Sequence, residues 1–243
     1  MAGAIAYEAA RILGLYAIWQ LAGTLSIMQV DGAHERGRRI VALQQAWHLP
    51  SEAALQRLVL PHPLWVQFCN GYYAIAHVPA LLVFLIWAFV RDRKRYAYWR
   101  TIMAVSTALC LAIQVIPVAP PRMLNGLGFV DTALLYKQSV YSALGRGMAG
   151  QLAAMPSVHV GWALIVAAGM WQISKSRWRW LGIVHAVLTV LVVSATANHY
   201  WADGIVAGAL IAMVVVAHQA QRWVLARRSA EPLRSGELGA YRP

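Results

Sequence analysis

Charged residues are scarce in this chain. Asp, Glu, Lys and Arg make up only 12% of its 243 residues, whereas hydrophobic residues make up 60%. The surface of an ordinary soluble domain needs about a quarter charged residues, so this composition excludes that class of protein. Together with a mean hydropathy of +0.52, it indicates an integral membrane protein.

Cysteine and acidic residues are also few. Cys69 and Cys110 both lie in or beside apolar segments, so we expect no disulfide framework. Nine acidic residues against 21 Lys and Arg give a formal net charge of +12. The basic residues form short clusters between apolar runs, as they do beside membrane spans, and we therefore expect no nucleic-acid partner.

Six apolar stretches are long enough, or nearly so, to cross a hydrocarbon core of about 30 Å at about 1.5 Å per residue. They are residues 10–30, 70–90, 101–119, 157–173, 180–197 and 203–221. The sequence therefore predicts an all-α polytopic membrane protein with a six-transmembrane-helix bundle. Residues 1–225 would form this single domain, and residues 226–243 a disordered cytoplasmic tail.

The connections between these stretches differ in charge. Residues 91–100 hold five basic residues and one acidic, residues 174–180 hold three basic and none acidic, and five arginines follow residue 221. By the positive-inside rule these three segments, and with them both termini, are cytoplasmic. The outer segments are then 31–69, 120–156 and 198–202. We expect short amphipathic helices in these outer loops, one of them over residues 51–60 at the membrane surface.

Polar residues gather at the outer ends of the spans. His199 and Asp203 are four residues apart, so on a helix the Asp203 carboxylate can accept the Nδ1 proton of His199 and leave Nε2 as a nucleophile or base. Ser157 and His159 open the fourth span, and Arg122 follows the third. Each set alone has a structural interpretation, such as a helix cap or a snorkelling arginine. Their convergence on one side favours function.

Together these residues supply what phosphoryl transfer without a metal requires. His199 would attack phosphorus and Asp203 would hold its tautomer, while His159 would protonate the departing oxygen. Arg122 and the backbone amides of the Ser157 turn would stabilise the equatorial oxygens. We expect no cofactor. A metal-dependent hydrolase is disfavoured because Asp203 is the only carboxylate close to the histidines in sequence.

These residues resemble the type-2 phosphatidic acid phosphatase superfamily of six-span, metal-independent membrane phosphatases and phosphotransferases. Pro156, Ser157 and His159 match its proline-serine-any-histidine motif, and His199 and Asp203 match its histidine-aspartate motif. The resemblance implies a phosphohistidine intermediate on His199, with His159 as the general acid.

The resemblance is incomplete where the family binds phosphate. Arg122 looks like the arginine of its first motif, but Val115 and Val193 stand where a lysine and a second arginine are expected. Lys137 and Arg146 in the outer loop are candidates to replace these cations.

A closer resemblance is to the inositol phosphorylceramide synthase-like, or inositolphosphotransferase, branch and its bacterial relatives. It covers about residues 70–210 and includes the segments 70–77, 119–123 and 128–132. It implies a bacterial plasma membrane protein.

Two further features stay open at this stage. His77 lies about two turns inside the second span and is either a core histidine bonded to a neighbouring helix or, with Asn70 and Tyr73, part of an acceptor pocket. Asp131 either caps a loop or positions Arg122.

The leading interpretation is an enzyme that cleaves a phosphorylated membrane lipid on the extracytoplasmic face. Water or an alcohol acceptor would then take the phosphoryl group, and the missing cations favour transfer of a diester headgroup such as phosphoinositol. The alternative is a non-catalytic membrane transporter or lipid-binding scaffold with a degenerate site. The sequence identifies neither the lipid nor the oligomeric state.

Overall fold

The computed structural model describes residues 10, 14, 31–139 and 151–230. Apart from residues 10 and 14, the predicted first span lies outside these ranges, as does Arg146. The described elements are all helical, as predicted, and the one β-type pairing among them is an isolated bridge between Val118 and Ala153.

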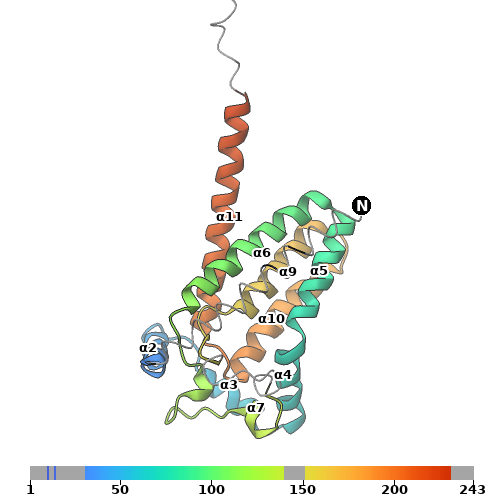
Figure 1. Ribbon diagram of the computed structural model, residues 1–243. Coiled ribbons are helices and arrows are strands. Elements are labelled where there is room, and N and C mark those ends of the chain that lie inside the picture. The colour runs from blue at the N-terminus through green and yellow to red at the C-terminus, as the bar shows by residue number, and fades with distance from the viewer. Residues whose placement is uncertain (1–9, 11–13, 15–30, 140–150, 231–243) are drawn as a thin grey trace, which may run out of the picture.

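The helices form an elongated bundle with a cluster of short helices at one end (Figure 1). In chain order they are α2 (Ala33–Ala46), α3 (Glu52–Val59), α4 (Pro63–Ile75), α5 (His77–Arg91), α6 (Arg93–Gln114), the 3-10 helix η2 (Pro121–Met123), α7 (Thr132–Leu135), α9 (Val158–Ile173), α10 (Arg179–Ala195) and α11 (Trp201–Ala230). α11 continues five residues past the predicted end of the domain at residue 225.

The six-span count is not confirmed. Within the described residues, α6 and α11 are long and apolar enough to cross a membrane, and α4 with α5 would be a third span if that pair, bent by 50°, crosses as one. α9 and α10 are apolar but have only 16 and 17 residues. At about 1.5 Å per residue each is shorter than a typical hydrocarbon core of about 30 Å.

Local side-chain caps mark the starts of some of the described helices. The Ser51 side chain accepts the Ala54 amide at the start of α3, and this confirms the helix predicted over residues 51–60. Asp92 separates α5 from α6 because its side chain accepts the Lys94 and Arg95 amides. α2, in contrast, was not predicted within the first outer segment.

α9 lies at the centre and packs against α5, α6, α10 and α11. Its approach to α10 is close because small residues face each other, namely Ala163 and Ala167 on α9 and Ala186 on α10. A Cβ atom added at Gly182 of α10 would lie 2.9 Å from the Ala167 Cα atom. Small residues that let two backbones approach in this way are typical of helix pairs in membranes.

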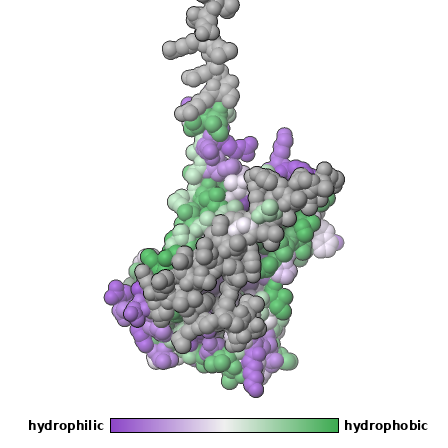
Figure 2. Space-filling model, in the orientation of Figure 1, coloured by the Kyte–Doolittle hydropathy of each residue, from purple (hydrophilic) through white to green (hydrophobic). Residues whose placement is uncertain are grey.

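The two ends of the bundle differ in charge. α2, α3, α4 and α7 gather at the lower end, whereas the α5–α6 turn with its basic residues lies at the upper end and α11 extends beyond it (Figure 1). Hydrophobic residues cover much of the visible described surface between hydrophilic groups at the two ends (Figure 2). Outward-facing apolar side chains such as Val83 on α5, Val187 on α10 and Val216 on α11 suit contact with lipid.

Candidate active site

Three loops that are far apart in sequence meet at the lower end of the bundle, and backbone hydrogen bonds join them. The Val118 amide donates to the Leu152 carbonyl at 2.6 Å. The Arg122 amide donates to the Ala197 carbonyl at 2.9 Å. The structure therefore brings together the three polar sets that the sequence placed at separate span ends.

His199 lies in the loop between α10 and α11, and its Nδ1 atom has two neighbours. The Ala154 carbonyl oxygen is 2.7 Å away and the Asp203 Oδ2 atom is 3.2 Å away. Because a carbonyl oxygen can only accept, Nδ1 carries the proton and Nε2 has the free lone pair. The predicted tautomer follows, although the shorter bond comes from Ala154, a backbone acceptor that leaves no signal in the sequence.

Asp203 has further partners in the first turn of α11. It is fully buried, and its Oδ2 atom also accepts the Tyr200 amide at 2.9 Å. Its backbone carbonyl accepts the Ser157 amide at 3.2 Å. Asp203 therefore holds the loop of His199 and the start of α9 in place at the same time.

His159, in the first turn of α9, contacts His199 directly. Its Nδ1 atom lies 3.3 Å from the His199 Nε2 atom. Since Nε2 of His199 accepts, Nδ1 of His159 must donate. In this structure the two imidazoles are bonded to each other, and a phosphate group has to separate them in order to bind between them.

The environment keeps His199 neutral. Burial lowers its pKa from the ordinary 6.5 to about 4, the hydrogen bond to the Ala154 carbonyl opposes this shift, and the positive charge of Arg122 adds to it. The imidazole therefore has an unprotonated Nε2 atom near neutral pH, which is the form that can attack phosphorus.

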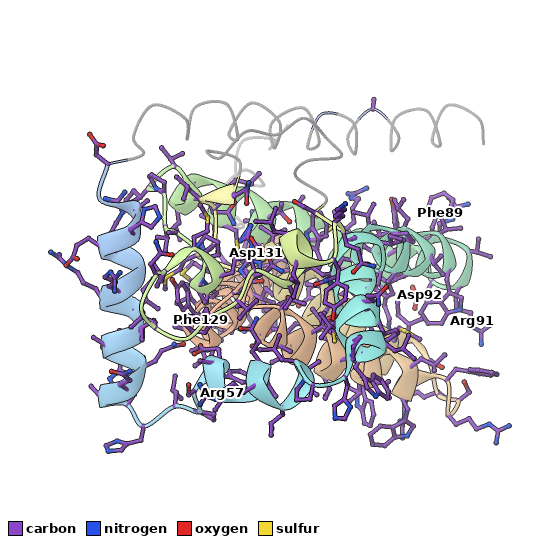
Figure 3. All side chains as sticks on the ribbon, turned by 90° about the horizontal axis from the view of Figure 1, so that it is seen from below. Arg57, Phe89, Arg91, Asp92, Phe129 and Asp131 are labelled. Carbon is purple, nitrogen blue, oxygen red and sulfur yellow. The ribbon has the colours of Figure 1, made fainter. Side chains whose placement is uncertain are left out.

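Asp131 and Gln151, both within the described residues, help to hold Arg122, which has only 2% of its side chain exposed. Its Nε atom lies 3.2 Å from Asp131 Oδ2, and its Nη2 atom donates to Gln151 Oε1 at 2.8 Å. The other Asp131 oxygen accepts the Leu134 amide at 2.9 Å and caps α7. Asp131 thus takes both roles that the sequence left open. It lies near the centre of the view in Figure 3.

Ser157 begins α9, and its hydroxyl oxygen accepts the Val160 amide at 3.2 Å. Its own amide is bonded to Asp203 and is not available to a ligand. The next amides, those of Val158 and His159, belong to the first helical turn and have no acceptor among the described residues. Such amides at a helix N-terminus can bind an anion.

The residues of the predicted substrate pocket have different surroundings. Asn70 bonds to Thr132 and Gln138 and thereby fastens α4 to the α7 region. The rings of Tyr73 and His77 each have their centres 4.8 Å from that of His159.

Lys137, the other described candidate, is exposed directly after α7. It makes no hydrogen bond or ion pair with His159, His199 or Arg122. A replacement cation at the histidine pair is therefore not found at this position.

Sequence reasoning missed the residues that fix the start of α11. Glu52 Oε1 accepts the Trp201 amide at 3.0 Å, and Gln44 Oε1 accepts the Ala202 amide at 2.9 Å. The Gln44 side chain also donates to Glu52 at 2.8 Å. These partners lie about 150 positions away in sequence, so no local pattern could reveal that they cap this helix.

A second unforeseen contact comes from Tyr200, which is 1% exposed. Its hydroxyl donates to the Ala119 carbonyl at 2.6 Å. The residue next to His199 is thereby fastened to the loop that carries Arg122.

Within residues 31–139 and 151–230, no group of three His, Cys, Asp or Glu side chains is arranged to hold a metal ion.

Comparison with known protein families gives a match. A family model described as the PAP2 superfamily matches residues 38–218, which include every described residue of the site. No curated protein and no solved structure is similar enough to the chain to match it.

Proposed function

The chain belongs to the PAP2 superfamily, which implies a phosphatase-type enzyme, and from this premise we propose that it is a metal-independent membrane lipid phosphatase or phosphotransferase acting through a phosphohistidine on His199. The substrate would be a phosphorylated lipid reached from the extracytoplasmic face. The observation that carries this proposal is the 3.3 Å contact between His159 and His199, in which His199 presents its lone pair at the place where a phosphate would enter.

In the first step the His199 Nε2 atom attacks phosphorus, and the bond from phosphorus to the leaving oxygen breaks. His159, protonated at both nitrogens once the anion is bound, gives its Nδ1 proton to that oxygen. In the second step a hydroxyl group attacks phosphorus, the phosphorus–nitrogen bond breaks, and the hydroxyl proton returns to His159. His199 regains its lone pair.

Arg122 and the free amides at the start of α9 would hold the remaining phosphate oxygens. A guanidinium held in place by Asp131 and Gln151 keeps its charge and can meet two oxygens with little reorganisation. Since Val115 and Val193 supply no cation, a singly charged phosphodiester is favoured over a doubly charged monoester. Transfer of a headgroup such as phosphoinositol to an alcohol is the reaction that fits this preference.

The proposal is tested with purified protein in EDTA, incubated with a panel of labelled phospholipids and polyprenyl phosphates, with and without an alcohol, and with products identified by mass spectrometry. Changing His199 to Gln should lower turnover by roughly 10³-fold or more, since loss of a nucleophile has effects of that size or larger. A matched control is His34→Gln, an exposed histidine on α2.

Three outcomes would contradict the proposal in different ways. Activity that disappears in EDTA would indicate metal-dependent chemistry. A His199→Gln protein that keeps its turnover would exclude the phosphohistidine. A wild-type protein that binds the lipids but converts none of them would instead support a non-catalytic scaffold.

A further inference from the structure

His77, the first residue of α5, has no place in the mechanism above, yet it is buried with 3% exposure. Neither of its ring nitrogens has a hydrogen-bond partner among the described residues. A neutral imidazole carries one donor and one acceptor, and leaving both unpaired inside a membrane protein costs free energy. Such a group calls for an explanation, and an absent ligand is one.

The hydroxyl group of Tyr72, an aromatic neighbour of His77, does not fill this gap. The Tyr72 ring centre is 5.5 Å from that of His77, but the Tyr72 hydroxyl bonds to Nδ1 of His185 at 2.6 Å. His185 is thereby satisfied while His77 is not. The expectation of a core histidine bonded to a neighbouring helix therefore fits His185 better than His77.

His77 stands on a particular side of the histidine pair. Its ring contacts that of His159, with 4.8 Å between centres, but makes no ring contact with His199. His77 is therefore on the His159 side of the histidine pair. When His199 attacks phosphorus, the leaving oxygen departs on the side of His159, and the incoming hydroxyl of the second step approaches from that same side.

On the basis of the proposed function, we propose that His77 binds the hydroxyl group that takes the phosphoryl group from His199. A hydroxyl both donates and accepts, so it can pair with His77 in either tautomer. His77 would hold the hydroxyl oxygen in line with phosphorus while the proton goes to His159. Holding the acceptor in this way favours the second step over the first.

The test separates the two steps with methyl p-nitrophenyl phosphate, a singly charged diester whose nitrophenolate leaving group departs without needing a proton. Release of nitrophenolate reports the first step, and intact-protein mass spectrometry at neutral pH reports the phosphoenzyme. In His77→Phe we expect a burst of nitrophenolate, a steady rate at least about tenfold lower than in wild type, and accumulated phosphoenzyme. His77→Asn, which keeps a donor and an acceptor, should restore part of the steady rate.

The matched control is His185→Phe, a half-buried ring in the same bundle that already has its partner within the protein. It should show no accumulation of phosphoenzyme. Adding glycerol then distinguishes the source of the hydroxyl group. If His77 holds an alcohol, His77→Phe lowers the yield of glycerol methyl phosphate relative to methyl phosphate. If it holds water, methyl phosphate falls relative to glycerol methyl phosphate.

The inference is overturned if both steps slow by the same factor in His77→Phe, or if neither changes, because His77 would then be a packing residue. Equal accumulation of phosphoenzyme in His185→Phe would also overturn it. Unchanged nitrophenolate release by His199→Gln would instead overturn the proposed function on which the inference rests. The two failures are therefore told apart by different variants.

Discussion

At the scale of single residues, the candidate site depends on which nitrogen carries each proton. The Ala154 carbonyl fixes the proton of His199 on Nδ1, and the lowered pKa of about 4 keeps the ring neutral near pH 7. A neutral imidazole with an oriented lone pair is a competent nucleophile, whereas an imidazolium is not. This gives the site a defined response to pH.

We expect Arg122→Gln to move the acid limb of the rate profile to higher pH. The Arg122 charge contributes to the low pKa of His199, so removing it makes that ring easier to protonate. The measurement is nitrophenolate release as kcat/KM against pH for both proteins. Arg57→Gln, which removes an exposed arginine on α3 labelled in Figure 3, is the control and should leave the acid limb unchanged.

The lowered pKa of His199 also makes the stability of the folded protein depend on pH. The folded pKa of about 4 lies below the ordinary 6.5, so protons bind more tightly to the unfolded chain between these two values. The contribution of His199 to stability is complete above pH 6.5 and decreases as the pH falls toward 4.

For the rate profile, an acid limb that moved to lower pH in Arg122→Gln would contradict the assigned role of Arg122.

A residue of the candidate site could be predicted from the sequence when it belonged to a short local pattern. The spacing of His199 and Asp203 and the Ser157–His159 pair are short patterns, and the structure brings them together. Glu52 and Gln44 act on α11 from distant helices, and Ala154 acts through its backbone, so no spacing could indicate them. His77 was noticed because a histidine inside an apolar run is unusual, but only coordinates reveal its missing partners.

At the scale of helices, contact between α9 and α10 positions the reactive groups. His159 lies in the first turn of α9, and Val193 lies in the last turn of α10, where its carbonyl accepts the Asn198 and His199 amides. Any change in the spacing of these two helices therefore changes the relation between the histidines. The close approach at Gly182 sets that spacing.

We expect Gly182→Ala to lower the free energy of unfolding by about 1–3 kcal/mol, as overpacking does in other well-packed interiors. The added methyl group would meet the Ala167 backbone at 2.9 Å, and a backbone cannot move aside as a flexible side chain can. Thermal unfolding in detergent measures the change, and nitrophenolate release should fall as well.

Gly208→Ala is the matched control because the nearest atom to its added methyl group is a Leu164 side-chain carbon at an ordinary 3.6 Å. It should be neutral or slightly stabilising, since Ala favours a helix over Gly by about 1 kcal/mol. Equal effects of the two substitutions would mean that the α9–α10 approach has no special importance.

Helices could be predicted where hydropathy or a capping residue marked them. They could be predicted less well where contacts with residues distant in sequence determine where the helix forms and lies. The α3 helix followed from its Ser51 cap and its apolar spacing. α2 has a polar sequence, and it is the packing of Gly37 against Tyr200 and the Ala119 carbonyl that fixes it in place. The bend between Ile75 and His77 lies one turn before Pro79, which cannot donate a hydrogen bond to the Ile75 carbonyl, but the second span was predicted as one rod.

At the scale of the whole molecule, the basic connections between helices and the histidine pair lie at opposite ends. The basic α5–α6 turn and the basic α9–α10 connection lie at the ends of α5 and α9 that are remote from the histidines. This separation agrees with the clusters of Lys and Arg from which the topology was predicted. Which end faces the outside follows from the positive-inside rule and remains a prediction.

Labelling of single cysteines in intact cells checks this orientation. In a background with Cys69→Ala and Cys110→Ala, we expect Asn125→Cys at the histidine end to react with a membrane-impermeant maleimide. Ser176→Cys, between α9 and α10, should react only after permeabilisation. Both native residues are exposed, so accessibility within the protein is matched. The reverse pattern would place the histidines on the cytoplasmic side.

The bond between His159 and His199 has one more consequence for the molecule as a whole. If a phosphate binds between these rings as proposed, it must first break the hydrogen bond that joins them. A small anion would have to do so with its phosphate contacts alone and should bind weakly, whereas a lipid could also use the binding energy of its tail. Discrimination between substrates would then begin at binding, before any covalent bond is made or broken.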